Sequence, residues 1–291
     1  MKGYDFMWIL LAIMSAFFAG VTAVLSKVGM KNINSNLGTA VRTIVVLIFA
    51  WLMVFVVGAQ DGISQISAKT LVFLILSGLA TGASWLCYFH ALKYGDVNKV
   101  VPIDKSSTVL TMILAFIFLH EQLTLLKAVC IVLIGAGTYL MIEKRSDTAG
   151  AKRSDWLLWA VLSAFFAALV SILGKVGISD ISSVLGTAIR TLVVLIMAWV
   201  VVWVTKSGHG IKAISGKDYA FLVLSGITTG LSWLCYYAAL KSGPASVVAP
   251  IDKLSILVTA AFSYIILKEK LTKKSLLGLI LLVAGTLLLL I

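Results

Sequence analysis

Charged residues are rare in the apolar stretches of this sequence, and those that occur there are the first candidates for chemistry. They are Arg42, Arg190, Asp104, Lys105, Asp252 and Lys253. A charge costs about 2.5 to 3.5 kcal/mol at the centre of a membrane-spanning helix, so each should face a protein interior or a wet cavity. Cations in such a cavity could bind an anionic group, and a carboxylate could bind an amine or carry a proton.

A structural role is the alternative for these charges. Arg42 and Arg190 could be neutralised by Asp104 and Asp252, or by backbone carbonyls, and so hold helices in register. The functional interpretation is favoured because all of these residues occur in both halves of the chain. We therefore expect Arg42, Arg190, Lys105 and Lys253 to bind substrate and the two aspartates to serve in coupling.

The surroundings of Asp104 indicate a disturbed helix. Neighbouring residues in a helix point about 100° apart, so Asp104 and Lys105 should face different partners. Pro102 lacks a backbone donor, and we expect the helix to kink or restart there. Asp104 would then lie in a first turn, near free amide groups at a positive helix end.

A stripe of hydroxyl and aromatic side chains forms a second candidate surface. Its members are Ser84, Trp85 and Tyr88, repeated as Ser232, Trp233 and Tyr236. Their spacing places them on one face of a helix, which could wall a ligand cavity or form an aromatic belt at the membrane surface. The belt suits Tyr88 near the helix end, whereas the cavity suits Trp85. All six are candidate substrate-binding residues.

The sequence offers little support for an enzyme. His90, His120 and His209 have no counterparts in the other half of the chain, and no metalloprotease, hydrolase or phosphate-loop motif occurs. The three cysteines form no CxxC pair. We therefore expect no catalytic residues, no metal and no cofactor.

The composition places these residues in a membrane protein. The chain has 291 residues, of which 60% are hydrophobic and 12% charged, with a mean hydropathy of +1.06. A soluble domain carries roughly 25% charged residues. Apolar stretches long enough to span a bilayer recur along the chain, so we predict an all-α, multi-pass protein of the cell (inner) membrane.

The chain is one unit written twice. At a constant offset of 148 residues, SAFFA at 15–19 matches 163–167, SWLCY at 84–88 matches 232–236, and PIDK at 102–105 matches 250–253. We predict a first five-helix repeat at 1–142, a polar linker at 143–155 and a second repeat at 156–291. Since five is odd, the repeats are inverted, giving ten transmembrane helices in an architecture typical of alternating-access transport.

The basic residues outside the spans predict the orientation. Most of them fall on the face that holds the linker, so the positive-inside rule places the linker in the cytoplasm and both termini outside.

Several of these features together resemble the drug/metabolite transporter superfamily, EamA-like branch. They are the paired five-helix repeats, Arg42 in the second helix, the Pro-x-Asp-Lys segment of the fourth helix and the junction LHEQLT at 119–124. The resemblance covers essentially the whole chain. It implies ten helices around a central cavity, transport of small metabolites such as amino acids, and termini in the cytoplasm, opposite to the charge count.

The function predicted from the sequence is secondary transport of small polar metabolites, such as amino acids or small organic anions, by alternating access. The alternative is a non-transport membrane protein, lipid-handling or sensory, whose buried charges are structural. The expected partners are a small-molecule substrate and the lipid bilayer, with no nucleic acid; a homodimer is one arrangement open to the chain.

Overall fold

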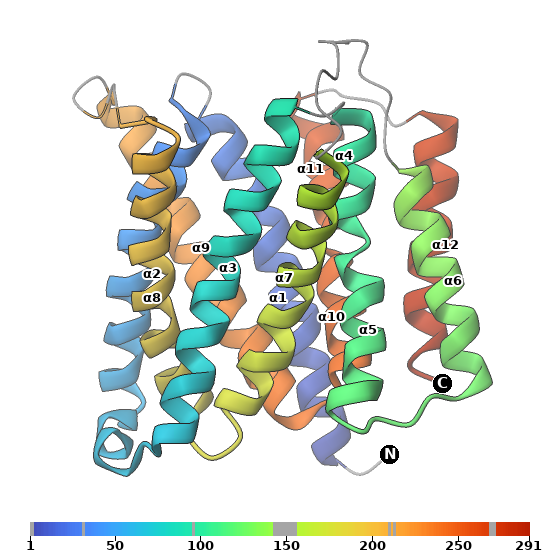
Figure 1. Ribbon diagram of the computed structural model, residues 1–291, viewed down its shortest axis with the longest axis horizontal. Coiled ribbons are helices and arrows are strands. Elements are labelled where there is room, and N and C mark those ends of the chain that lie inside the picture. The colour runs from blue at the N-terminus through green and yellow to red at the C-terminus, as the bar shows by residue number, and fades with distance from the viewer. Residues whose placement is uncertain are drawn as a thin grey trace.

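Helices make up nearly all of the computed structural model, which describes residues 3–30, 33–94, 97–141, 156–208, 211, 214–267 and 272–291 (Figure 1). The predicted linker lies outside the described residues. The first half contains α1 (Gly3–Gly29), α2 (Ser35–Val56), a 3-10 helix η1 (Ala59–Gln65), α3 (Ala68–Tyr94), α4 (Val97–Lys105), α5 (Ser107–Phe118) and α6 (Leu125–Leu140).

The second half follows the same plan. Its helices are α7 (Trp156–Gly177), α8 (Ser183–Val204), α9 (Gly216–Ser242), α10 (Ala245–Lys253), α11 (Ser255–Leu267) and α12 (Lys273–Leu288). The bounds of α2, α4 and α6 recur in α8, α10 and α12 at the offset of the sequence repeat. Thr124 and Thr272 cap α6 and α12, where each hydroxyl accepts a hydrogen bond from a backbone amide of the first turn.

The helix that carries Asp104 breaks later than the sequence indicates. Pro102 lies inside α4, and the interruption comes at Ser106, whose amide and hydroxyl both donate to the carbonyl of Ile103, at 3.1 and 2.6 Å. The corresponding interruption in the second half is at Leu254. Asp104 therefore lies in the last turn of α4, and the prediction that it sits in a first turn beside free amides was wrong. The proline weakens the helix, but the tight turn at Ser106 ends it.

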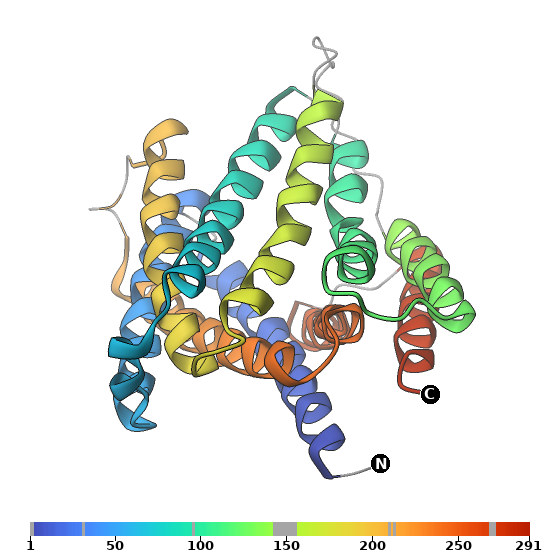
Figure 2. The same cartoon turned by 60° about the horizontal axis from the view of Figure 1, so that its bottom comes forward.

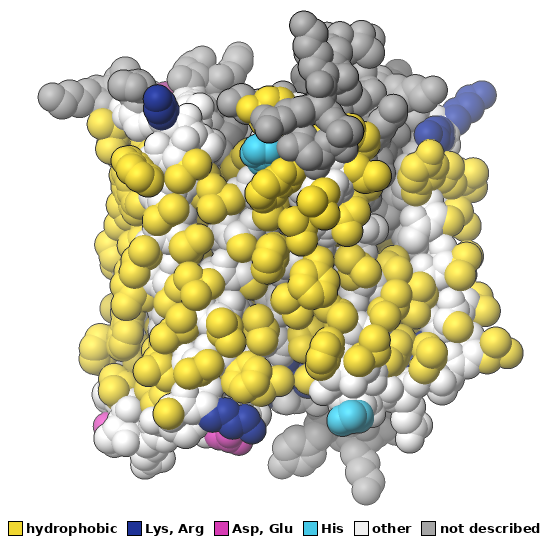
Figure 3. Space-filling model, in the orientation of Figure 1, with side chains coloured by type: hydrophobic (Ala, Val, Ile, Leu, Met, Phe, Trp, Pro, Cys, Tyr) yellow, Lys and Arg dark blue, Asp and Glu magenta, His cyan; other side chains and the backbone are white. Residues whose placement is uncertain are grey.

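The outer surface of the bundle suits a bilayer. Seven helices among the described residues are long and apolar enough to cross a membrane, and α6 is a shorter apolar helix. Large hydrophobic side chains are exposed on them, for example Ile48 on α2 and Ile196 on α8. Figure 3 shows these apolar side chains covering one face, with charged groups and histidines near its upper and lower edges. The protein is a multi-pass membrane protein.

The two halves are packed crosswise. Helix α3 lies against α7 and α8, while α9 lies against α1 and α2. Helices α6 and α12 form a separate pair at the edge of the bundle (Figure 2). A Cβ added at Gly137 on α6 would lie 2.6 Å from the carbonyl oxygen of Gly278 on α12, so this pair needs glycine to approach so closely.

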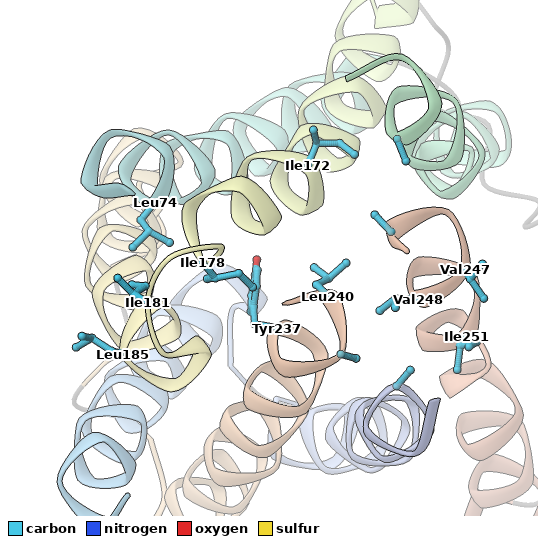
Figure 4. Close-up of a cluster of buried hydrophobic side chains, with 14 of the residues drawn as sticks. Leu74, Ile172, Ile178, Ile181, Leu185, Tyr237, Leu240, Val247, Val248 and Ile251 are labelled. Atoms are coloured by element: carbon cyan, nitrogen blue, oxygen red, sulfur yellow. The ribbon is translucent and has the colours of Figure 1, made fainter. Parts of the chain in front are cut away.

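The core is larger at the end of the bundle that carries both termini. Residues of α10 meet Leu240 of α9 and Ile172 of α7 in the largest buried cluster (Figure 4). All described side chains from Ala245 to Ile251 are buried. In α4, by contrast, Ile103 is only partly buried and Lys105 is exposed. Two helices that share the Pro-Ile-Asp-Lys segment therefore have different surroundings, and the molecule is asymmetric although its sequence is repeated.

Candidate functional site

A cavity of about 360 Å³ lies between the two halves of the bundle, at the level of the broken helices. Six helices contribute to its wall: α1, α3, α7, α8, α9 and α10. The lining residues that were also predicted from sequence are Ser84, Trp85, Arg190, Ser232, Trp233, Tyr236, Asp252 and Lys253. The remaining candidates, Arg42, Lys105, Tyr88 and Asp104, do not line it. One volume therefore collects most of the predicted groups, predominantly those of the second half.

Arg190 is the cation of the cavity wall, although only 3% of its surface is exposed. Its Nε donates to Ser77 Oγ at 2.9 Å and its NH2 to Thr81 Oγ1 at 2.7 Å. The guanidinium carbon lies 5.2 Å from the ring centroid of Trp233 and 4.9 Å from that of Tyr237. The NH1 group is buried without a hydrogen-bond partner. Arg190 is thus fixed by neutral groups, with one donor nitrogen unused.

The proposed neutralisation of the arginines by aspartates does not occur. Within the described part of the chain, neither Arg42 nor Arg190 forms an ion pair with Asp104 or Asp252. Hydroxyl groups can satisfy guanidinium donors without supplying negative charge. The cavity therefore keeps the positive charge of Arg190, and Lys253 adds to it.

Each aspartate is held by a serine of the other half. Ser15 Oγ on α1 donates to Asp252 Oδ1 on α10 at 2.6 Å, and Ser163 Oγ on α7 donates to Asp104 Oδ1 on α4 at 2.8 Å. The Ser15 hydroxyl also lies 3.2 Å from that of Ser232. A carboxylate that accepts a hydrogen bond from a hydroxyl group is stabilised without a nearby cation. These crosswise bonds tie the two broken helices to α1 and α7.

The other predicted residues have distinct positions. Lys105 and Lys253 lie within electrostatic range of each other. Tyr236 lines the cavity, and its hydroxyl oxygen lies 2.8 Å from that of Ser171. Its counterpart Tyr88 instead packs against Ala91, Val100 and Ala160 at the other end of the bundle, outside the cavity.

Comparison with known proteins decides the family. The EamA-like transporter family matches residues 6–143 and again 154–291, so it covers nearly the whole chain. The chain belongs to the EamA-like transporter family. The resemblance seen in the sequence is confirmed, and the two matched segments agree with two copies of one unit.

Individual relatives of this EamA-like transporter are also transporters by name. An "Uncharacterized transporter in cobO 3'region" of a Sinorhizobium species is 46% identical over 134 residues, which are 46% of this chain and 95% of that protein. An S-adenosylmethionine uptake transporter of Rickettsia bellii is 26% identical over 216 residues, 73% of this chain and 70% of the relative. A solved crystal structure with 14% identity has a TM-score of 0.77 over 97% of this chain and 96% of its own, which shows a shared fold.

The EamA-like transporter also contains a polar contact between its halves, at the end of the bundle that carries both termini. Glu121, in the loop between α5 and α6, accepts hydrogen bonds from the amides of Ala245 at 2.6 Å and Ser246 at 3.0 Å, and from the Ser246 hydroxyl. The Lys175 ammonium lies 3.9 Å from the same carboxylate. Glu121 therefore caps α10, and Lys175 does not extend toward lipid headgroups, as a lysine at a helix end often does.

Sequence reasoning missed three groups in this transporter. Tyr237 contacts Arg190, but its counterpart is Phe89, so the repeat gave no reason to select a hydroxyl-bearing ring there. Ser15 and Ser163 belong to a repeated SAFFA segment, which was a usable signal because both halves keep a serine in an otherwise apolar stretch. Among the described residues, no group of His, Cys, Asp and Glu could hold a metal ion.

Proposed function

We propose that this EamA-like transporter is a secondary carrier of the inner membrane that moves a small metabolite bearing a carboxylate. The observation that carries the proposal is Arg190, a residue of the cavity wall whose buried NH1 has no hydrogen-bond partner. A carboxylate placed there would accept a charge-assisted hydrogen bond from a donor already oriented by Ser77 and Thr81.

The charges of the cavity favour a zwitterion or an organic anion. Arg190 and Lys253 supply two cations and Asp252 one anion, so an anionic group is favoured and an amine could lie near Asp252. Amino acids and small organic acids are the substrate classes that fit. The named relatives that take up S-adenosylmethionine add a third candidate, which has an amino-acid portion. The volume of about 360 Å³ is at the low end of ligand pockets, roughly 300 to 1,000 Å³.

The asymmetry of the bundle supports transport by alternating access. We count α4 with α5, and α10 with α11, as one crossing each, which gives ten crossings in two inverted repeats at 1–142 and 156–291, joined by 143–155. Helix α10 packs against α5 and α7, whereas α4 has no comparable packing with α11 or α1 among the described residues. One end is thus closed in this state, and exchange of the two arrangements would close the other end instead.

The aspartates are proposed to couple transport to protons. Asp252 lines the cavity, and both carboxylates accept a hydroxyl hydrogen bond rather than pairing with an arginine. We propose that a proton on these carboxylates travels with the substrate, since neither carboxylate is paired with an arginine.

The test combines ligand stabilisation with flux. Purified protein is screened by thermal shift against amino acids, organic acids and S-adenosylmethionine, because a ligand at 100 times its Kd adds about 2.7 kcal/mol of stability. A stabilising compound is then assayed for uptake into proteoliposomes. Arg190→Gln should abolish stabilisation and uptake, Arg190→Lys should retain part of both, and the exposed control Lys217→Gln should retain both. Absence of any stabilising or transported carboxylate would refute the proposal.

A further inference from the structure

A second, smaller cavity of about 150 Å³ lies between α2, α3 and α8. Its lining residues are Asn36, Thr39, Arg42, Trp85, Phe89, Ala198 and Val201. Trp85 lines both this cavity and the main one. This smaller cavity, the Arg42 chamber, adjoins the main one at Trp85 and is lined by the arginine that the main cavity lacks.

Arg42 is incompletely satisfied in this chamber. Its NH1 donates to Ser26 Oγ at 2.7 Å, and its Nε is buried with no partner. Arg190, its counterpart, makes two hydrogen bonds and contacts two aromatic rings. A buried cationic donor without an acceptor is unfavourable unless a ligand supplies one at some stage of the cycle.

The difference between the two arginines is not caused by helix spacing. A Cβ added at Gly78 would lie 3.2 Å from the carbonyl oxygen of Arg190, and one added at Gly226 would lie 3.1 Å from that of Arg42. The helices thus approach each other equally in both halves.

The hydroxyl groups facing the two arginines behave differently. Ser77 and Thr81 accept hydrogen bonds from Arg190 while their own hydroxyls donate to the backbone carbonyls of Val170 and Ser77. Their counterparts Ser225 and Thr229 also donate to backbone carbonyls, but Arg42 donates to Ser26 instead of to them. The guanidinium of Arg42 is therefore withdrawn from these groups.

Local sequence differences favour this withdrawn position. Ser26, which holds Arg42, has Gly174 as its counterpart, and a Cβ at Gly174 would lie 2.5 Å from the ring of Tyr237. Arg190 therefore has no hydroxyl at the position equivalent to Ser26 to which it could donate a hydrogen bond. Asn36 of the chamber has the apolar counterpart Val184. The first half thus has a serine at Arg42 and an asparagine in the same chamber, where the second half has glycine and valine.

We propose that the Arg42 chamber is a second anion-binding site, which holds the carboxylate of the substrate on its way to or from the main cavity, with Trp85 in the wall of both cavities. The inference rests on the proposed function, because it takes the substrate to be a carboxylate. The volume resembles that of a cavity that holds one benzene molecule, so a short carboxylate or the anionic end of a longer metabolite would fit.

Iodide is the probe for this site, because it is an anion that quenches tryptophan fluorescence on contact. The contribution of Trp85 is obtained by subtracting the quenching of Trp85→Phe from that of the wild type, in detergent. We expect Arg42→Gln to remove this contribution while quenching by neutral acrylamide stays unchanged. The matched control Ser26→Ala, which keeps the charge of Arg42, should retain it. Sodium acetate should compete with iodide, whereas added phosphatidylglycerol should not.

The outcomes separate this inference from the proposed function. Iodide quenching of Trp85 that persists in Arg42→Gln, or competition by phosphatidylglycerol alone, would overturn the second site even if carboxylate uptake is measured in proteoliposomes. Arg42-dependent quenching that acetate relieves would support the site. If no carboxylate is transported by the wild type while that quenching remains, the function proposed above fails and the anion site stands.

Discussion

Replacement of Glu121 should open the closed end of the bundle. The carboxylate accepts three hydrogen bonds from Ala245 and Ser246 at the start of α10 and has the Lys175 ammonium 3.9 Å away. A hydrogen bond to a charged group contributes about 1.5 to 3 kcal/mol when both partners are shielded from water. Water can replace part of these contacts after the end has opened. We therefore expect Glu121→Ala to destabilise the closed state relative to the open state by a free energy of about 3 kcal/mol.

That free energy corresponds to a change of about a hundredfold in the ratio of closed to open molecules, because each 1.4 kcal/mol is a factor of about ten. Glu121→Gln keeps an acceptor oxygen but loses the charge, and should give a smaller change of about tenfold. If Glu121 holds α10 through its charge, the open fraction should be largest in Glu121→Ala, smaller in Glu121→Gln and smallest in the wild type.

Spin-label distances across the closed end measure this change. Labels are placed at Leu123→Cys in the α5–α6 loop and at Ser242→Cys at the end of α9, both exposed, in a protein whose native cysteines are replaced. The wild type should give one short distance, and Glu121→Ala should add a longer one. Asp218→Ala is the control, since Asp218 accepts a hydrogen bond from Ser215 within the start of one helix rather than between the halves. An unchanged distribution in Glu121→Ala would refute the reasoning.

Three further predictions concern coupling, the aromatic wall and orientation. Asp104→Asn and Asp252→Asn should each impair concentrative uptake while counterflow exchange continues and the Tm changes little. The loss should be greater in Asp252→Asn because, of the two aspartates, only Asp252 lines the cavity. Full concentrative uptake in both, or loss of fold in both, contradicts a coupling role. Trp233→Leu should weaken uptake more than Trp85→Leu, because Trp233 contacts Arg190; equal and undiminished uptake in folded variants assigns both rings to packing. An impermeant thiol reagent on intact cells should label cysteines at the termini and spare those at 143–155, and the reverse pattern would invert the orientation.

The sequence was informative about the helices and the residues around the cavity where both halves keep the same residue type at equivalent positions. Hydropathy located the helices, and the offset between the repeats located Asp252, Trp233 and Ser232 in one cavity, because each of these groups is retained at an equivalent place. The exact site of the helix break was not predictable, since Pro102 only weakens the helix and the turn at Ser106 depends on a side-chain hydrogen bond.

The asymmetry of the site also lay beyond the sequence. Arg42 and Arg190 have the same neighbours in the repeat pattern, yet only Arg190 is held by the serine and threonine of the facing helix, Ser77 and Thr81. The conformation of the whole bundle decides which arginine forms hydrogen bonds to the facing helix. A repeated sequence alone does not indicate which of the two halves adopts that arrangement. Small departures from the repeat, such as Gly174 in place of Ser26, were the local signals of the difference.

The crosswise serine–aspartate bonds bear on how such a chain could have arisen. Since Ser15 holds Asp252 and Ser163 holds Asp104, neither half contains both members of either pair in contact. A polypeptide made of one half would complete its pairs only by meeting a second copy inserted upside down in the same bilayer. Fusion of two such copies would fix their stoichiometry and relative direction. It would also let single positions differ between the halves, as Ser26 and Asn36 in the first half and Tyr237 in the second differ from their counterparts. The two serine–aspartate hydrogen bonds are the contacts that an antiparallel dimer of single repeats would form.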